Sequence, residues 1–421
     1  MDPIGRNRYN RAMAPLRCVV AGGGAAGFFG AIACAEARPD AEVVLLEKSP
    51  EWLAKVSLSG GGRCNVTHHC FDVTRLVQHY PRGRDELIGP FHRWQPRDTV
   101  AWFEQRGVPL KAEADGRMFP ITDDSATIVN CLMDSARRAG VKMSASRGLR
   151  TLAPQPGGGF AIGLTTRETM VCDRILLASG GNRNTAGYRL GSSVGHHIEP
   201  PVPSLFTFHI ADPSLHALAG IAVPDARVAA PDHRLAQDGP VLITHWGVSG
   251  PAVLKLSAWG ARAFADAGYT FDLRITWHRA SRESMLDAMA ELRRKHPARA
   301  VSGGGVVDVP ARLWEWLCAR AGIASDRQWG QLSNDHAGRL ALEVTACRLP
   351  VSGKSMFKDE FVTCGGVRLS EVNFKTMESR LCPGLHFAGE VLDIDAVTGG
   401  FNFQAAWTTG WIAGRAMAGV T

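Results

Sequence analysis

The sequence predicts an α/β fold in which a parallel, Rossmann-type sheet is split by a β-rich insertion and a small helical insertion. Three observations support this prediction. A strand–turn–helix–strand pattern occupies residues 16–47, the same glycine-rich style returns after about residue 355, and the stretch between them has a different character. Because both ends of the chain show the same pattern and the middle does not, we expect one domain that is interrupted by an insertion.

The first elements form a βαβ unit. Residues 16–20 are an apolar strand, residues 27–37 are a helix with small residues on one face, and residues 42–46 (EVVLL) are a second apolar strand. Parallel strands need a crossover connection of this kind, so the pattern predicts a parallel sheet.

Apolar periodicity places the remaining elements. The helix at 98–105 has Asp98 as its candidate N-cap, and the amphipathic helix at 126–139 ends at Gly140. The other predicted strands are 141–152, 160–166, 174–178, 205–210, 226–230, 240–244, 270–276 and 385–388, and the other predicted helices are 281–296, 311–321 and 404–418.

These elements divide the chain into five segments. We expect a disordered extension at 1–15, the first part of the nucleotide-binding domain at 16–195, a β-rich substrate-side insertion at 196–280, a small helical domain at 281–350 and the second part of the nucleotide-binding domain at 351–421.

Composition excludes several classes of protein. Apolar residues make up 45% of the chain, which excludes a disordered protein, and the 46 Gly lack the strict period of collagen. The net charge of +7 is compatible with a nucleic acid or an anionic cofactor and proves neither.

The ten cysteines show no C-x-x-C spacing, so we predict no metal site, and a chain of this size needs no disulfides. The apolar stretch after Arg17 resembles a secretory signal, but three consecutive glycines favour a strand, a turn and a helix. No other stretch is long and apolar enough to span a bilayer. We therefore expect a cytoplasmic protein with reduced thiols and no membrane contact.

The main motif is Gly22-x-Gly24-x-x-Gly27, which fits G-x-G-x-x-G. It follows a strand, opens a helix and precedes an acidic residue, Glu47, at the end of the next strand. In this motif one glycine forms the tight turn, one lets the backbone approach a pyrophosphate and one allows close helix–strand packing. The helix N-terminus donates to the phosphates and Glu47 accepts from the ribose hydroxyls, so we predict binding of an ADP moiety.

The C-terminal part favours a flavin over a nicotinamide. A strand ends at Gly389-Glu390, and a glycine-rich loop then opens a helix; the loop residues are Thr398, Gly399, Gly400, Phe401 and Asn402. An acid at a strand end can hold a ribityl hydroxyl, and a helix N-terminus can stabilise negative charge on a reduced flavin. The alternative is an edge strand and a core helix without ligand contact.

A second glycine-rich loop follows the βαβ unit. Its candidate cofactor-binding residues are Ser59, Gly60, Gly61, Gly62, Arg63, Cys64 and Asn65. The glycines let backbone amides face a ring or a phosphate, and the polar side chains add donors. Cys64 is also a candidate redox thiol, although no second cysteine lies at motif spacing.

The chain from about residue 17 to residue 418 resembles the aminoacetone-oxidase-like (BaiN-like) family of bacterial FAD flavoproteins. The matching stretches are GGGAAG at 22–27, SGGGRCNVT at 59–67, GRMFP at 116–120, LLASGG at 176–181, THWGVSGPAVLKLS at 244–257, TCGGV at 363–367, TMESR at 376–380 and FAGEVLDIDAVTGGFNFQAAWTTG at 387–410.

The resemblance implies a glutathione-reductase-like FAD domain split by a β-barrel-like unit and a small helical unit. It implies that FAD also contacts Ala25, Ala26 and Lys48, and that the SGGGRCN loop lies beside the isoalloxazine. Ser179 and Gly180 would contribute further contacts. The family commonly has Thr in place of Ser179 and a different stretch in place of residues 182–184, which affects local contacts and not the fold.

We expect an enzyme, an oxidoreductase that transfers a hydride between a small organic substrate (amine, amino ketone or enone) and flavin N5. His245 in the substrate-side loop is the candidate acid or base, with a turn-fixing role as the alternative. Arg63 is a candidate for binding an anionic substrate or, as we prefer, the N1–C2=O edge of the flavin. NAD(P)H is a possible transient reductant and O2 a possible acceptor, while the oligomeric state stays open.

Two alternatives come from other classes. One is a flavoprotein linked to RNA modification, because the chain is basic and the helix at 284–296 ends in RRKH. That helix carries Met and Leu where a base-stacking platform would expose aromatic side chains, and Trp314 and Trp316 are expected to pack, so we do not expect a nucleic-acid partner. The other alternative is a flavin-binding protein without turnover.

Overall fold

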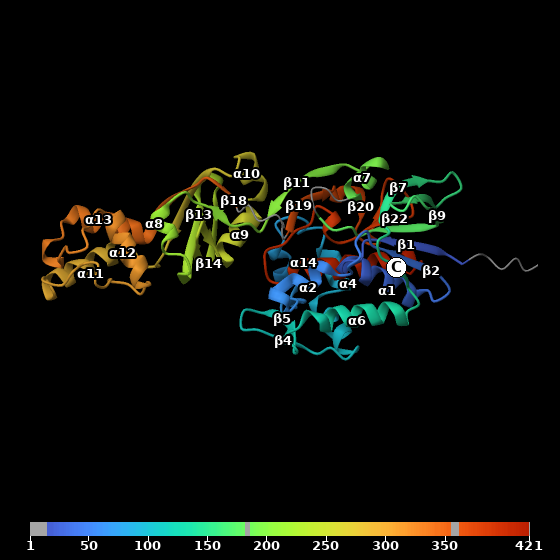
Figure 1. Ribbon diagram of the computed structural model, residues 1–421, viewed down its shortest axis with the longest axis horizontal. Coiled ribbons are helices and arrows are strands. Elements are labelled where there is room, and N and C mark those ends of the chain that lie inside the picture. The colour runs from blue at the N-terminus through green and yellow to red at the C-terminus, as the bar shows by residue number, and fades with distance from the viewer. Residues whose placement is uncertain (1–14, 182–185, 355–361, 421) are drawn as a thin grey trace, which may run out of the picture.

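The computed structural model describes residues 15–181, 186–354 and 362–420, and the protein is an elongated molecule of three units (Figure 1). The Rossmann unit, residues 15–204 and 362–420, lies at one end. The β unit, residues 205–277 and 347–354, lies in the middle, and the helical unit, residues 278–346, lies at the far end.

The Rossmann unit is built around a sheet with the strand order β20-β21-β22-β10-β1-β2-β6. The strands from β22 to β6 are parallel, and Val19 of β1 lies opposite Val44 of β2 and Ile175 of β10. The bounds are β1 (Arg17–Ala21), β2 (Glu42–Leu46), β6 (Lys142–Ser144), β10 (Arg174–Leu177), β20 (Val372–Asn373), β21 (Glu378–Ser379) and β22 (Leu385–Phe387). The chain order reverses between β1 and β10, and open α/β sheets bind ligands at such a point, beyond the carboxyl ends of the strands.

Helices α1 and α14 pack closely because their contacting residues are small. A Cβ on Gly410 would lie 2.5 Å from the carbonyl oxygen of Ala26, and one on Gly414 would lie 2.2 Å from that of Gly30. The helices of this unit are α1 (Ala25–Ala37), α2 (Ala54–Gly62), α3 (Val73–Leu76), α4 (Ile88–Arg93), α5 (Pro96–Glu104), α6 (Ser125–Arg138), α7 (Ala186–Ser193) and α14 (Phe401–Met417).

Smaller sheets flank the main sheet. One contains β3 (Thr67–His68), β4 (Leu110–Ala112) and β5 (Arg117–Pro120), and another contains β7 (Leu149–Pro154), β8 (Phe160–Leu164) and β9 (Thr169–Cys172). The antiparallel pair β11 (Ile198–Ser204) and β19 (Val362–Val367) runs between the Rossmann unit and the β unit (Figure 1).

The β unit is an antiparallel sheet, and it shares one apolar core with the helical unit. Its strands are β12 (Phe208–His209), β13 (Ala222–Ala230), β14 (Leu235–Thr244), β15 (Gly247–Ser249), β16 (Phe271–Thr276), β17 (Cys347–Val351) and β18 (Gly353–Lys354), and its helices are α8 (Pro213–His216), α9 (Pro251–Trp259) and α10 (Ala261–Asp266). The helical unit consists of α11 (Arg282–Lys295), α12 (Ala311–Arg320) and α13 (Asn334–Ala346), with connecting turns.

The unit boundaries differ from the expected ones at two places. Residues 347–354, expected in the helical domain and the returning nucleotide-binding domain, form β17 and β18 and complete the sheet of the β unit. Residues 196–204, expected in the β-rich insertion, contain the whole of β11, which pairs with β19 of the Rossmann unit. The expected extension at 1–15 lies outside the described residues except for its last residue. Among the residues that the structure describes, every helix is too short or too polar to cross a lipid bilayer.

Candidate flavin-binding site

The structure brings the predicted glycine loops together at the carboxyl ends of β1, β10 and β22. A Cβ on Gly22, after β1, would lie 2.3 Å from the carbonyl oxygen of Ala178, after β10. A Cβ on Gly389, after β22, would lie 2.8 Å from the Cβ of Ala26 at the start of α1. Loops that are more than 350 residues apart in the sequence therefore meet at one edge of the sheet.

The three glycines of the fingerprint have three different surroundings. Gly22 has a φ of +123°, which a side chain would strain, and Gly27 is so close to the preceding turn that a Cβ would lie 1.8 Å from the carbonyl oxygen of Gly22. At Gly24 a Cβ would meet no atom within 4 Å. Two glycines are thus required by the protein itself, and the third faces open space where a pyrophosphate would approach.

Glu47 is held at the end of β2 by backbone amides. Its Oε2 accepts from the N–H of Gly23 at 2.7 Å and its Oε1 accepts from the N–H of Ser49 at 2.9 Å. A carboxylate has further lone pairs on both oxygens, so the ribose hydroxyls can still bind there. Lys48 follows it with an exposed side chain.

The SGGG loop is a break in helix α2. Ser59 has extended backbone angles, and Gly60, Gly61 and Gly62 have φ of +60°, +69° and +84°. A Cβ on Gly61 or Gly62 would meet no atom within 4 Å. The run of left-handed residues turns backbone groups outward beside open space, as a loop that faces a flat ring requires.

Asn65 ties this loop to the start of α14. With its amide in the orientation that satisfies both atoms, it accepts from the N–H of Gly400 at 2.9 Å and donates to the carbonyl of Thr67 at 3.0 Å. Below them, Thr67 donates to the buried Gln404 at 2.6 Å. The loops at 59–65 and 398–402 therefore form one surface.

The remaining predicted loop residues flank this surface. Thr398 and Asn402 are half-buried, and Asn402 exchanges hydrogen bonds with the backbone of Ala396 at 2.9 and 3.0 Å. Ser179 and Gly180 are half-buried after β10, and Gly180 has a φ of +72° with open space around its Cβ position. Ala25 and Ala26 are buried in the first turn of α1.

Glu390 has a cationic neighbour that sequence reasoning missed. Its carboxylate lies 2.6 Å from Nζ of Lys55 and accepts from the N–H groups of Thr363, at 2.9 Å, and Gly181, at 3.3 Å. Thr363 lies in the TCGGV stretch, so the family resemblance was a signal that could have found it, whereas Lys55 lies one helical turn before Ser59, outside every matching stretch.

The side chain of Arg63 is engaged by acidic and aromatic neighbours. Its guanidinium lies 2.7 Å from Glu113, 3.4 Å from Asp123 and 4.0 Å from the centre of the Phe119 ring. The hydrogen bond to Glu113 is the main reason why the pKa of Arg63 is raised. An anionic substrate or the flavin edge would have to compete with these carboxylates, and the proposed role of Arg63 stays a prediction.

Cys64 has the environment of a structural thiol. It is fully buried, and burial raises the pKa of its thiol to about 12. Because the thiolate is the reactive form, this environment opposes a redox role and leaves a backbone role in the loop. Its φ of +62° continues the left-handed geometry of the glycines.

His245 lies in the exposed turn between β14 and β15. Next to it, the carbonyl of Trp246 accepts from the N–H of Ile210 at 2.9 Å, just before α8, where Ser214 bonds to Trp316 of the helical unit at 2.8 Å. The turn thus lies at the end of the β unit that meets the helical unit. This position favours the turn-fixing alternative, and the catalytic role of His245 stays a prediction.

The residues present fit an FAD. Helices α1 and α14 both begin without a side-chain cap, at Gly24 and Gly400, so N–H groups and the positive ends of two helix dipoles are available to phosphates and to the flavin edge. The hydroxyl of Thr363 is buried without a hydrogen-bond partner beside Glu390. Open space at Gly24, Gly61 and Gly180 outlines the cradle between these groups.

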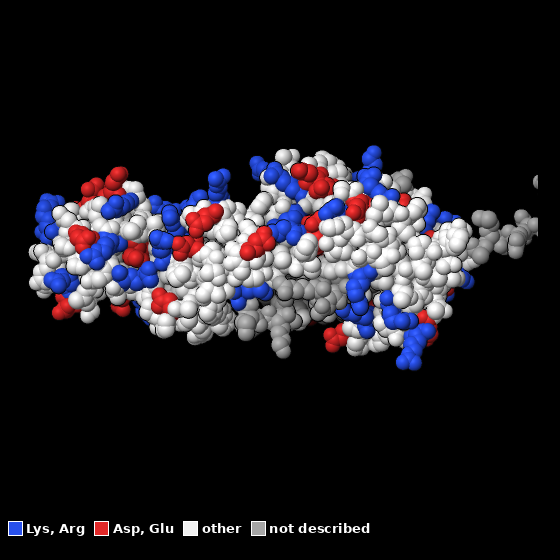
Figure 2. All heavy atoms as spheres, turned by 90° about the horizontal axis from the view of Figure 1, so that it is seen from above, with Lys and Arg blue, Asp and Glu red and all other residues white. Residues whose placement is uncertain are grey.

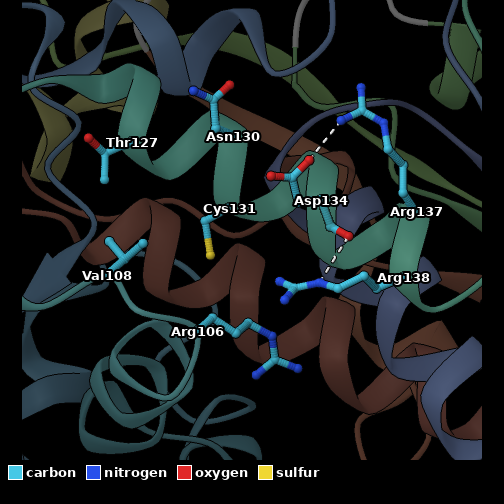
Figure 3. A pocket seen from close by; sticks show the side chains of 8 residues that line it. All are labelled: Arg106, Val108, Thr127, Asn130, Cys131, Asp134, Arg137 and Arg138. Atoms are coloured by element: carbon cyan, nitrogen blue, oxygen red, sulfur yellow. Dashed lines mark hydrogen bonds and ion pairs between the residues drawn. The ribbon is translucent and has the colours of Figure 1, made fainter.

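A separate hollow lies between α6 and the segment that follows α5 (Figure 3). It is lined by Arg106, Val108, Thr127, Asn130, Cys131, Asp134, Arg137 and Arg138, none of which was a predicted site residue. Arg137 pairs with Asp134 at 2.8 Å and Arg106 pairs with Glu36 at 2.7 Å, so these charges are largely compensated. Within the described ranges, no three His, Cys, Asp or Glu side chains are arranged to hold a metal ion.

The fold and the site define a Rossmann-type flavoprotein oxidoreductase. The chain belongs to the HI0933-like family, whose Rossmann-domain model matches residues 16–416. The predicted fold class, the oxidoreductase class and the family resemblance are thereby confirmed.

Two relatives span nearly the whole chain. A ribosomal RNA dihydrouridine synthase of Escherichia coli is 30% identical over 404 residues, covering 93% of this chain and 96% of its own length. A 3-dehydro-bile acid delta(4,6)-reductase of Clostridium scindens is 30% identical over 413 residues, covering 96% and 99%. Among solved structures, a 3-ketosteroid-delta4-(5alpha)-dehydrogenase of Rhodococcus jostii shares the fold with a TM-score of 0.51 and 14% identity, over 97% of this chain and 98% of its own.

Proposed function

We propose that this protein reduces a carbon–carbon double bond conjugated to a carbonyl group, with FAD as its cofactor. The observation that carries the proposal is the agreement between two relatives at 30% identity. One is named for making dihydrouridine and the other for a delta(4,6) reduction. Their substrates differ, but both names describe hydrogenation of an unsaturated ring. The enone class therefore has more support than amines or amino ketones.

The site residues have distinct tasks in this reaction. Gly22, Gly24 and Gly27 would hold the pyrophosphate at the start of α1, Glu47 the adenosine ribose, and Glu390 with Lys55 the ribityl chain. The loops at 59–65 and 398–402 would hold the ring. Bound FAD would supply the hydride chemistry, and the chain would orient the substrate.

The source of electrons is a separate question. The G-x-G-x-x-G motif is assigned to FAD, so NAD(P)H would need a transient site over the flavin. Anaerobic mixing of the oxidised protein with NADPH, NADH and primary amines identifies the donor, since the true donor bleaches the flavin. His245→Ala in the same assay tests the catalytic role of His245: if that role is real, the substrate-driven step slows while FAD stays bound.

The proposed reaction itself is tested by mixing reduced protein with conjugated and saturated carbonyl compounds in the absence of O2. We expect 2-cyclohexen-1-one, a steroid 4-en-3-one or uridine to reoxidise the flavin, and cyclohexanone, the matched saturated control, to leave it reduced. Reoxidation by none of the conjugated compounds would contradict the proposal.

A uracil base in RNA is the second candidate substrate, because one relative is named for ribosomal RNA. The surface gives limited support: acidic and basic side chains are interspersed over the β and helical units on the face shown in Figure 2. Trp314 and Trp316 are 1% and 7% exposed, so they pack as expected and offer no stacking platform. A salt-dependent gel shift of ribosomal RNA fragments would favour this candidate, and its absence would favour a small molecule.

We also expect the protein to act in the cytoplasm. All ten cysteines are free thiols, which supports a reducing compartment.

A further inference from the structure

Lys255, in helix α9 of the β unit, has no counterion among the residues that the structure describes. Its side chain is half-buried, and among the described residues it has neither an ion pair nor a hydrogen bond. Partly buried ammonium groups are normally paired, since desolvating a charge is costly. A cation that has no partner within the described part of the chain can bind a negatively charged or strongly polar group.

Helix α9 presents Lys255 to the Rossmann unit. Three residues further on, the carbonyl of Ala258 accepts from the guanidinium of Arg82 at 2.7 Å, and Leu254 and Trp259 pack on the core of the Rossmann unit. Residues three apart share one face of a helix, so Lys255 lies on the same side as Ala258. Arg82 in turn forms a buried ion pair with Asp395, just before the loop at 398–402.

A stack of aromatic rings lies at the start of α14. The ring of His79 stacks on Phe401 at 4.0 Å and 12°, and the ring of His68 stacks on Phe401 at 4.6 Å and 20°. Phe401 directly follows Gly399 and Gly400 of the predicted flavin loop. The stack therefore adjoins the position expected for the flavin ring.

The histidines of this stack are neutral. Burial is the main cause that lowers the pKa of His79 to about 4, and the positive charge of Lys255 contributes, together with His68. Burial also lowers the pKa of His68, with Lys255 and His69 acting in the same direction and Asp115 opposing them. Near pH 7 the positive charge of Lys255 therefore acts on both neutral histidines, and the carboxylate of Asp115 also acts on His68.

His68 provides a second unsatisfied group. Its Nε2 lies 3.1 Å from the carbonyl oxygen of Asp115, which can only accept, so this nitrogen carries the proton. Its Nδ1 is then an acceptor, and it is buried without a partner. The cation calls for a ligand acceptor and the orphaned Nδ1 of His68 calls for a ligand donor, so the two groups indicate a polar ligand that offers both.

We infer that Lys255 binds the carbonyl oxygen of the substrate beside the flavin ring and is a catalytic residue of the reaction; this inference rests on the proposed function. Bound FAD would supply a hydride to the β carbon; the electron pair of the C=C bond would then move toward the carbonyl, whose oxygen would take the negative charge of an enolate. The ammonium group of Lys255, which pairs with no carboxylate among the described residues, would stabilise that oxygen. The α carbon takes its proton from solvent water, which completes the saturated product.

The test uses 4-nitrophenolate, whose anionic oxygen next to a planar ring resembles the enolate, with the FAD-loaded full-length protein. We expect the wild type to bind it with a shift in the visible spectrum, Lys255→Met to bind it roughly 30-fold or more weakly, and Lys255→Arg to retain most of the affinity. The control Lys142→Met removes an exposed lysine that pairs with Glu42 at 2.7 Å on the far edge of the sheet, and it should bind like the wild type.

Two further readouts keep the outcomes separate. The NMR titration of His79 should show a higher pKa in Lys255→Met, because the cation that lowers it is gone, while the FAD affinity and the flavin potential stay near wild-type values. Equal phenolate affinity in Lys255→Met and the wild type, or a loss explained by lost FAD, would overturn the inference. Failure of the wild type to reduce any conjugated carbonyl would instead overturn the proposed function, and the phenolate titration would still decide whether Lys255 binds an anionic oxygen.

Discussion

The glycines of the G-x-G-x-x-G motif have different surroundings, and these explain why each position needs a glycine. Gly27 is forced by the carbonyl oxygen of Gly22, whereas Gly24 has nothing within 4 Å of its Cβ position and an ordinary φ of −94°. The same residue type is thus required for the fold at one position and for the ligand at another. A sequence motif cannot separate these two requirements, but substitutions can.

Two alanine variants make this separation measurable. We expect Gly24→Ala to change the free energy of unfolding by no more than about 1 kcal/mol, because the position tolerates a side chain, and to weaken FAD binding about tenfold or more, because the Cβ occupies the approach to the pyrophosphate. Gly27→Ala should cost at least ~2 kcal/mol of stability through a backbone clash. Urea unfolding and flavin-fluorescence titration check both values, and wild-type FAD affinity in Gly24→Ala would contradict the assignment.

Some helices and strands were predicted close to their observed positions because the sequence pattern that specifies them is local. Strand β2 has the predicted bounds, since EVVLL is a buried apolar run between turns. Helix α5 begins two residues before the predicted N-cap: Pro96 occupies its first turn, and Asp98 pairs reciprocally with Gln95 in a capping box. Asp98 therefore stabilises the helix start from inside the helix.

Other elements were missed because their partners lie far away in the sequence. The expected strand at 141–152 is two strands, β6 in the parallel sheet and β7 in a side sheet, with Ser146 at a positive φ of 56° between them. Strand β18, which was not predicted, contains two residues and pairs with β12, which precedes the helical unit in the sequence and lies within the predicted strand at 205–210. Helix α13 was not predicted. Apolar periodicity cannot report such pairings.

The contact between α9 and the flavin loop was also invisible in the sequence. Arg82 joins the carbonyl of Ala258 to the buried Asp395, which also accepts from Ser204 at 2.7 Å. These residues come from four separate segments of the chain. The resemblance to known flavoproteins located the loops but not the contacts of Arg82 with Ala258 and Asp395, which we call the Arg82 clamp. The placement of Lys255 relative to His68 and His79 depends on this clamp.

Removing the positive charge of Arg82 should destabilise the fold. We expect Arg82→Met to lower the free energy of unfolding by about 3 kcal/mol or more, because Asp395 would be left as an unpaired buried carboxylate. Adding Asp395→Asn in the same chain should recover part of the loss, since the buried charge is then absent. Urea unfolding of both variants measures this, and a loss below ~1 kcal/mol for Arg82→Met would show that the clamp is not a stabilising contact.

For the molecule as a whole, buried neutral histidines should lower the free energy of unfolding at acidic pH. His386 is 2% exposed in the central sheet, and burial is the main cause that lowers its pKa to about 4 from an ordinary value of 6.5. The unfolded chain therefore binds this proton first, so the free energy of unfolding falls as the pH falls from 6.5 to about 4.

The expected size of this loss is up to about 3 kcal/mol for His386 alone. His79 acts in the same direction, with a smaller contribution because it is more exposed. Urea unfolding measured between pH 7 and pH 4 tests the expectation, and His386→Asn should flatten the curve relative to the wild type. A wild-type curve without a decline in this range would contradict the assigned environment of His386.

The central claim is that this FAD enzyme saturates a double bond conjugated to a carbonyl. The most direct measurement is the product formed when photoreduced, FAD-loaded protein is mixed with a steroid 4-en-3-one, 2-cyclohexen-1-one or uridine in the absence of O2. We predict that the oxidised flavin spectrum returns and that mass spectrometry finds a product heavier by two hydrogens, in an amount equal to the flavin reoxidised. A flavin that stays reduced with every conjugated carbonyl and is reoxidised by O2 alone would contradict the claim.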